Sequence, residues 1–158
     1  MAVRTRPDQR VAAQAHSLGY RSVVVPVVDS ELSRQALEAA ARLASDRGEV
    51  TVVTVLEVPL GLPLDTLLDE EERDARDLLR SAQAIVERFG IDTSTELVRA
   101  RYAADAIVGL ADERGAELIV VGTPRRIRRG ASAFGATVRG ILHDAQCRVA
   151  LLTAQGAR

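Results

Sequence analysis

Five apolar runs along the chain alternate with stretches in which apolar residues recur every three or four positions. The runs are rich in Val, Leu, Ile and Thr, which is typical of strands buried on both faces of a sheet. The stretches between them have the spacing of helices that bury one face. The predicted strands cover residues 22–28, 50–58, 95–101, 117–121 and 148–153. This alternation predicts a Rossmann-like α/β fold, a doubly wound five-stranded parallel sheet flanked by helices.

Single residues predict where the helices begin and end. Asp29 and Ser30 are favourable N-cap residues for the first helix, and Gly48 is expected to end it. Asp105 is expected to cap a later helix.

In doubly wound sheets, ligands bind beyond the carboxyl ends of the strands, where the strand order reverses. The loops after the first and fourth strands are therefore expected to line one crevice.

The length and composition limit what the chain can be. Its 158 residues suit one domain over residues 20–154, with tails at 1–19 and 155–158. The core must be aliphatic, because 47% of the residues are hydrophobic but only 3% are aromatic. The 21 basic and 22 acidic residues give a net charge of −1, which argues against a dedicated nucleic-acid-binding protein.

The expected compartment is the cytoplasm. The single cysteine, Cys147, excludes an internal disulfide and fits a reducing environment. No apolar stretch approaches the roughly 20 residues of a membrane-spanning helix. The N-terminus has arginines but lacks the apolar segment of a signal peptide.

The motifs of several enzyme classes are absent from the sequence. There is no Gly-x4-Gly-Lys-Ser/Thr phosphate loop, no Gly-x-Gly-x-x-Gly fingerprint, no Gly-x-Ser-x-Gly elbow and no His/Cys spacing typical of a metal site. We therefore predict no catalytic residue and no protein-bound metal. We expect no enzymatic activity beyond, at most, slow ATP hydrolysis.

The loop after the fourth predicted strand carries the most distinctive chemistry. Gly122 ends an apolar run, four arginines lie within residues 125–129, and Gly135 precedes a short helix. Backbone N–H groups, arginine side chains and a helix N-terminus together favour an anion. Three interpretations of the arginines stay open: a clamp on a phosphate, a patch for lipid headgroups or nucleic acid, and a solvated loop without a ligand.

Four stretches carry a resemblance to a known family. They are Val23-Val24-Val25-Pro26-Val27-Val28-Asp29-Ser30-Glu31, Leu118-Ile119-Val120-Val121-Gly122, Phe134-Gly135-Ala136-Thr137-Val138 and Cys147-Arg148-Val149-Ala150-Leu151-Leu152. With them the chain resembles the universal stress protein family from about Arg21 to Thr153. The resemblance implies a five-stranded parallel sheet, dimers formed through the last strand and, in some members, binding of ATP or AMP.

The nucleotide-binding branch of that family is similar in carrying Gly-x2-Gly-x9-Gly-Ser/Thr after the fourth strand. Here Gly122 and Gly135 stand at the first and third glycine positions, and Arg125 replaces the second. A glycine there lets backbone N–H groups close on a phosphate without an intervening side chain. Arg125 blocks that approach unless it turns outward or binds the phosphate itself.

Two further positions of the branch are shifted by one residue. The Ser/Thr position falls on Ala136, and Thr137 follows it. The branch also tends to end its first strand with an aspartate near the adenosine. That position falls on Val28, and Asp29 follows it, so Asp29 substitutes only if the strand end bulges by one residue.

This resemblance implies a nucleotide site at the ends of the first, second and fourth strands and the start of the last helix. Its expected residues are Pro26, Val27, Val28, Asp29, Val55, Val121, Gly122, Arg125, Gly135, Ala136, Thr137 and Val138. The ligand would be ATP, AMP or a cyclic nucleotide, with Mg²⁺ only if ATP is bound.

Two functions follow as hypotheses. The first is a homodimeric regulatory domain that binds an adenine nucleotide as a sensor. The second is an interaction module with a decayed nucleotide site, which would act through dimerisation or on a membrane transporter. The transporter version of this second hypothesis is supported by a resemblance: Gly-x-Pro-Arg-Arg followed by Phe-Gly-x-Thr-Val is similar to the stress-protein domains attached to amino-acid permeases. The apolar last strand, Arg148 to Thr153, favours a dimer by itself, because an exposed sheet edge invites pairing with another chain.

Overall fold

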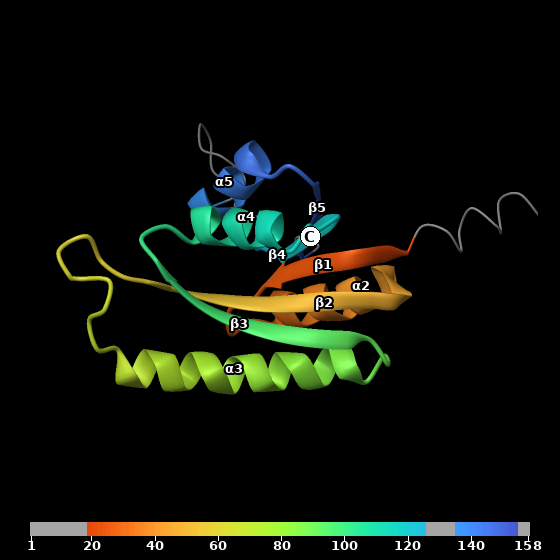
Figure 1. Ribbon diagram of the computed structural model, residues 1–158, viewed down its shortest axis with the longest axis horizontal. Helices are drawn as coiled ribbons and strands as arrows, with labels where there is room; N and C mark the ends of the chain where they lie inside the picture. The colour runs from red at the N-terminus through yellow and green to blue at the C-terminus, as the bar shows by residue number, and fades with distance from the viewer. Residues whose placement is uncertain (1–18, 126–134, 155–158) are drawn as a thin grey trace, which may run out of the picture.

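The computed structural model describes residues 19–125 and 135–154, which form one sheet between two layers of helices (Figure 1). Five strands alternate with four helices, as the hydrophobic pattern predicts. In chain order the elements are β1 (Tyr20–Pro26), α2 (Glu31–Leu43), β2 (Ala44–Glu57), α3 (Asp69–Glu87), β3 (Asp92–Ala100), α4 (Ala103–Glu113), β4 (Leu118–Gly122), α5 (Ala136–Asp144) and β5 (Arg148–Leu152). Among these described helices, none is long and apolar enough to cross a membrane.

The sheet is parallel, and its strand order is β3-β2-β1-β4-β5. From β1 the chain moves outward through β2 and β3, and then crosses back to place β4 on the other side of β1. The order therefore reverses between β1 and β4, where Val24 pairs with Ile119. This confirms the predicted fold class and places β5 at an edge of the sheet.

Alternate residues of β1 face different helix layers. Val23 and Val25 pack in a core with α2 and α3, whereas Val24 packs in a core with α4 and α5. All three side chains are completely buried. Burying a valine side chain contributes about 1.5–3 kcal/mol. The two-sided burial explains why the strand is a continuous valine run rather than an alternating one.

The prediction that Gly48 ends the first helix is wrong. The helix α2 ends at Leu43 and the next strand begins at Ala44, so Gly48 lies within β2. The partner residue on β2 advances from Ala44 to Glu49 while β1 advances only from Tyr20 to Ser22. A Cβ atom on Gly48 would lie 2.6 Å from the carbonyl oxygen of Tyr20, so the glycine permits this irregular pairing.

The prediction that Asp105 caps a helix is also wrong in detail. It lies within the first turn of α4, and the N-cap residue, Tyr102, makes no side-chain hydrogen bond to the helix. Instead Ala103 N donates to Glu57 Oε1, at the end of β2, over 2.8 Å. The cap comes from a residue far away in the sequence, because the ends of β2 and β3 lie together at the same edge of the sheet.

Candidate functional site: a crevice at the carboxyl edge of the sheet

A crevice of about 410 Å³ opens where β1 and β4 end. The ends of β1, β2 and β4 form its floor, and α4 and the first turn of α5 contribute its walls. This is the point where the strand order reverses, which is the usual binding position in open α/β sheets. The sequence-predicted site residues that line it are Pro26, Val27, Val28, Val55, Val121, Gly122, Thr137 and Val138.

The turn between β1 and α2 is held from two sides. Val27 N donates to Val53 O over 2.9 Å, and Thr54 Oγ1 donates to Val27 O over 2.9 Å. On the helix side, Val28 N donates to Ser33 Oγ over 3.0 Å. These bonds fix the Val28 backbone and leave its side chain 64% exposed beside the crevice.

Ser30 is the N-cap of α2, as predicted. Its Oγ accepts a hydrogen bond from Ser33 N over 3.1 Å and lies 3.2 Å from Ser33 Oγ. The Ser33 side chain is almost fully buried and lines the crevice. Ser30 therefore starts the helix, and Ser33 connects that start to the lining of the crevice.

Asp29 lies elsewhere. It lines a different cavity, of about 660 Å³ between α2 and α3, which Asp74 and Asp77 also line. Its neighbour Val28 lines both cavities. The acid position of the nucleotide-binding branch is therefore occupied by an apolar side chain, and Asp29 is not among the residues that line the crevice.

Gly122 ends β4 at a point of close packing. Its Cα faces the backbone of Leu32, near the start of α2, with no space for a side chain. The next residue, Thr123, is buried and its N–H donates to Leu152 O over 2.9 Å, so β5 also holds this strand end. Pro124 follows on the crevice wall. Gly122 is thus required by the packing of α2 on β4 whether or not a ligand binds.

The Gly/Arg loop is described only at its beginning. Arg125 is exposed and is not among the residues that line the crevice. Arg126, Arg128 and Arg129 lie outside the described residues. The three interpretations of the arginines therefore stay as predictions.

The first turn of α5 borders the crevice with its backbone. Gly135 is the N-cap residue and contributes no side-chain cap, and Gly135 and Ala136 are exposed outside the lining. Thr137 and Val138 do line the crevice. The N–H groups of a helix N-terminus carry a partial positive charge, so this wall favours an anion.

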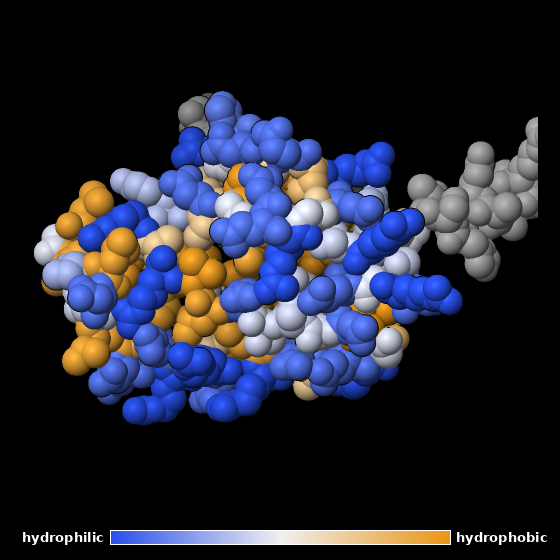
Figure 2. Space-filling view, in the orientation of Figure 1, coloured by the Kyte–Doolittle hydropathy of each residue, from blue (hydrophilic) through white to orange (hydrophobic). Residues whose placement is uncertain are grey.

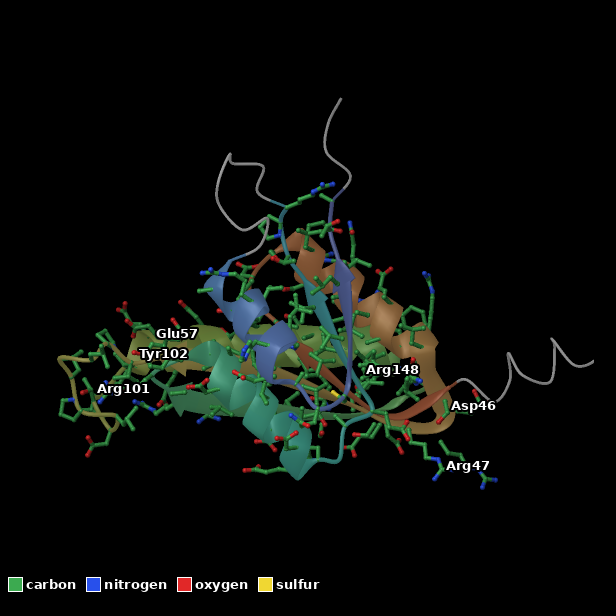
Figure 3. The ribbon with its side chains drawn as sticks, turned by 90° about the horizontal axis from the view of Figure 1, so that it is seen from above. Asp46, Arg47, Glu57, Arg101, Tyr102 and Arg148 are labelled. Atoms are coloured by element: carbon green, nitrogen blue, oxygen red, sulfur yellow. The ribbon has the colours of Figure 1, made fainter. Side chains whose placement is uncertain are left out.

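The opposite end of the crevice is apolar apart from one carboxylate. Val53, Val55 and Ile107 line this end. Among the described residues of the lining, Glu57 is the only one with a charged side chain. Figure 3 shows Glu57 beside Tyr102 at the end of β2, consistent with its hydrogen bond to Ala103 N. The crevice therefore offers an apolar surface at one end and helix amides at the other.

Sequence reasoning missed several residues of the crevice. Ser33 and Thr123 are buried polar residues, Glu57 lies two residues beyond Val55 on β2, and Ala103 and Ile107 come from α4, which was not assigned to the site. Glu57 could have been found, because it is the last but one residue of a predicted strand, at the carboxyl edge. Nothing local marked the others.

Two titratable groups outside the crevice have shifted pKa values. The pKa of His143 is raised from 6.5 by its hydrogen bond to Asp144 and by the charge of that carboxylate, and the Nδ1–Oδ1 distance is 2.7 Å. Burial raises the pKa of Cys147, which favours the unreactive thiol. Within residues 19–125 and 135–154, no three His, Cys, Asp or Glu side chains gather as a metal site would require.

Comparison with known proteins agrees with this geometry. A universal stress protein of Methanocaldococcus jannaschii is 28% identical over 140 residues, which are 82% of this chain and 80% of that protein. The structure of a universal stress protein from Archaeoglobus fulgidus superposes with a TM-score of 0.70 at 29% identity, over 84% of this chain and 98% of that one. A structure of the universal stress protein from Archaeoglobus fulgidus in complex with dAMP gives 0.68 at 28% identity, over 84% and 97%.

The family match covers residues 19–153, which include all five strands and every described residue of the crevice lining. The chain therefore belongs to the universal stress protein family.

Proposed function

We propose that the crevice binds an adenine nucleotide and that the protein acts as a nucleotide-responsive regulatory domain. The observation that carries the proposal is the division of the crevice into an apolar end on β2 and an amide-rich end at α5. A nucleotide has the same division, with a flat base at one end and phosphate at the other. The dAMP complex of the related Archaeoglobus fulgidus protein supports the assignment.

The proposed orientation follows from charge. The base lies against Val55 and Ile107, and the phosphates lie toward Gly122 and Thr137. The reverse orientation would put phosphate beside the carboxylate of Glu57, where like charges repel. Arg125 follows Gly122 by three residues, and we propose that its side chain turns toward a bound phosphate.

The test is calorimetric titration of the purified protein with AMP, ATP and cyclic AMP, with Mg²⁺ added only for ATP. Thr137→Glu places a negative charge at the phosphate end and is expected to weaken binding at least about tenfold, which corresponds to 1.4 kcal/mol. Leu142→Glu, on an exposed part of the same helix, is the matched control and leaves binding unchanged. Absence of heat up to about 1 mM ligand, with the protein folded by circular dichroism, would contradict the proposal.

A second candidate function is an interaction module without a nucleotide. The observation in its favour is β5, whose residues are only partly buried and which has no neighbour on its outer side among the described strands. We propose that this edge joins two copies into a homodimer, and that such a dimer could act on a partner such as a membrane transporter. Sedimentation velocity tests the dimer, and a monomer at all concentrations would contradict it. A dimer that binds no nucleotide would favour this second function over the first.

A further inference from the structure

The connection between β2 and α3 displays leucine side chains to solvent. Within this segment, Val58 to Leu68 and here termed the leucine loop, Leu60 is 76% and Leu67 80% exposed. Leu62 and Leu64 are 40% and 47% exposed. Figure 2 shows hydrophobic surface gathered at the end of the molecule where Figure 1 draws this loop. Side chains of this kind, displayed together rather than singly, are typical of an interaction surface.

The backbone of the leucine loop is folded into two consecutive turns. Leu62 N donates to Pro59 O over 3.0 Å, which closes the first turn. Thr66 N donates to Pro63 O over 3.1 Å, and Thr66 Oγ1 donates to the same carbonyl over 2.7 Å, which closes the second. Each turn begins at a proline, whose carbonyl oxygen accepts the hydrogen bond that closes the turn.

Two arginines from the end of β3 hold these turns in place. Arg99 Nη1 donates to Leu64 O over 3.2 Å and to Thr66 O over 2.6 Å, and its Nε donates to Glu72 Oε1 over 3.1 Å. The second arginine, Arg101, donates through Nη1 to Val58 O over 3.1 Å and also to the carbonyl of the next residue. The exposed leucines therefore belong to an ordered loop whose carbonyl groups accept hydrogen bonds from Arg99 and Arg101.

This arrangement is unfavourable unless something covers the leucines. Ordering a loop costs conformational entropy, which proteins normally offset by burying the apolar side chains of that loop. Here the arginines supply the order, while Leu60 and Leu67 remain in water. A surface held in its binding conformation beforehand loses less entropy when a partner arrives.

The charges around the loop restrict the partner. Residues 57–72 contain no basic residue, and Arg73 is the first to follow. The six carboxylates of this stretch are Glu57, Asp65, Asp69, Glu70, Glu71 and Glu72. Arg99 forms an ion pair with Glu72 and also donates to the loop backbone, and Arg101 donates to the loop backbone, so the other five carboxylates carry the negative charge of this border. An anionic membrane would be repelled, and so would the same loop of a second copy.

We propose that the leucine loop is a docking surface for a partner segment that is both apolar and basic, such as an amphipathic helix with Leu on one face and Lys or Arg along its borders. The leucines contact the apolar face, and the acidic border pairs with the basic residues. Tyr102, which is 57% exposed and adjoins Glu57 through Ala103, extends the surface. The proposal is independent of nucleotide binding.

The experiment uses the full chain and a fluorescent amphipathic helical peptide made of leucine and lysine, followed by anisotropy. Leu60→Ser with Leu67→Ser changes two exposed side chains and is expected to weaken binding by about tenfold or more. Leu142→Ser, at an exposed leucine on α5, is the matched control and leaves the affinity unchanged. A second variant, Arg101→Gln, keeps every leucine but releases two carbonyls, and it is expected to weaken binding as well. Raising the salt concentration weakens binding to the unaltered protein.

Several results would overturn the proposal. One is no binding of the peptide to the unaltered protein, and another is equal affinity for the double variant. A third is equal binding of a matched peptide that carries glutamate in place of lysine. An oligomer seen by sedimentation that the double variant abolishes would show that the loop binds a second copy of the chain. Binding of the unaltered protein to neutral phosphatidylcholine vesicles that the double variant abolishes would show that the loop binds a membrane.

Discussion

Gly122 at the end of β4 lies so close to Leu32 that a Cβ atom on the glycine would be 2.2 Å from the Leu32 carbonyl oxygen. Neither the backbone of α2 nor that of β4 can yield without disturbing the sheet. Such a contact explains a glycine at the rim of the crevice by packing alone. It also separates the structural need for Gly122 from any contact with a phosphate.

Gly122→Ala is therefore expected to destabilise the protein without any ligand, by about 1–3 kcal/mol, the usual range for overpacking. Urea unfolding measures the change. Gly109→Ala is the control, since nothing lies within 4 Å of its Cβ position in the middle of α4. It should stabilise by up to about 1 kcal/mol, because alanine favours helix. Equal stability of Gly122→Ala and the unaltered protein would show that the two backbones can separate.

Glu57→Ala is expected to lower the free energy of unfolding by about 0.5–2 kcal/mol, as removal of a helix N-cap does. The reason is the loss of the 2.8 Å hydrogen bond from Ala103 N at the first turn of α4. Glu57→Gln keeps an acceptor and should retain most of the stability. Asp105→Ala, at the residue that the sequence alone would name as the cap, should have the smaller effect. Thermal and urea unfolding of the three variants measures these changes in stability. A larger loss of stability in Asp105→Ala than in Glu57→Ala would contradict the assignment of Glu57 as the cap of α4.

Ser33→Ala removes the acceptor of the Val28 N–H beneath the crevice. This hydrogen bond is only partly buried, so its loss should cost about 0.5–1.5 kcal/mol. We therefore expect lower stability and faster hydrogen exchange of the Val28 amide. Ser81→Ala, at an exposed serine on α3, is the control and should change neither quantity. Unchanged exchange at Val28 would mean that Ser33 does not hold the turn.

Asp144→Asn is expected to bring the pKa of His143 back toward 6.5, because the carboxylate is what raises it. A folded pKa above the unfolded one means that the pair stabilises the protein below the unfolded pKa. That contribution is lost as the pH rises through the folded pKa. An NMR titration of the imidazole in both proteins measures the shift. The same pKa in both would indicate the helix terminus as its cause.

Much of the fold follows from the sequence because burial leaves a local pattern. The valines of β1 form a continuous run since both faces of the strand are covered, and that run marks the strand without knowledge of its neighbours. Gly90 follows α3 with φ of +73°, as a glycine that ends a helix should. The alternation of strands and helices then restricts the topology and places a crevice at the strand ends.

Other features depend on register and could not be predicted in this way. Gly48 looked like the end of a helix, but its neighbour is Tyr20 on the adjacent strand. Glu57 caps a helix that begins 46 residues later. The exposure of the leucine loop could not be predicted either, because the sequence does not show that arginines at the end of β3 bind the loop carbonyls while the leucines remain exposed.

The periodicity, the fold class and the family resemblance can be read from the chain alone, because each depends on residues close together in the sequence. The three-dimensional arrangement was needed to show that Asp29 lines the cavity beside α3 and not the crevice, whereas its neighbour Val28 lines both. It also decided that Gly122 is needed against Leu32. The physical reason is the same in both cases: a turn of one or two residues sets which side chain faces which layer, and the packing of α2 against β1 and β4 sets that turn.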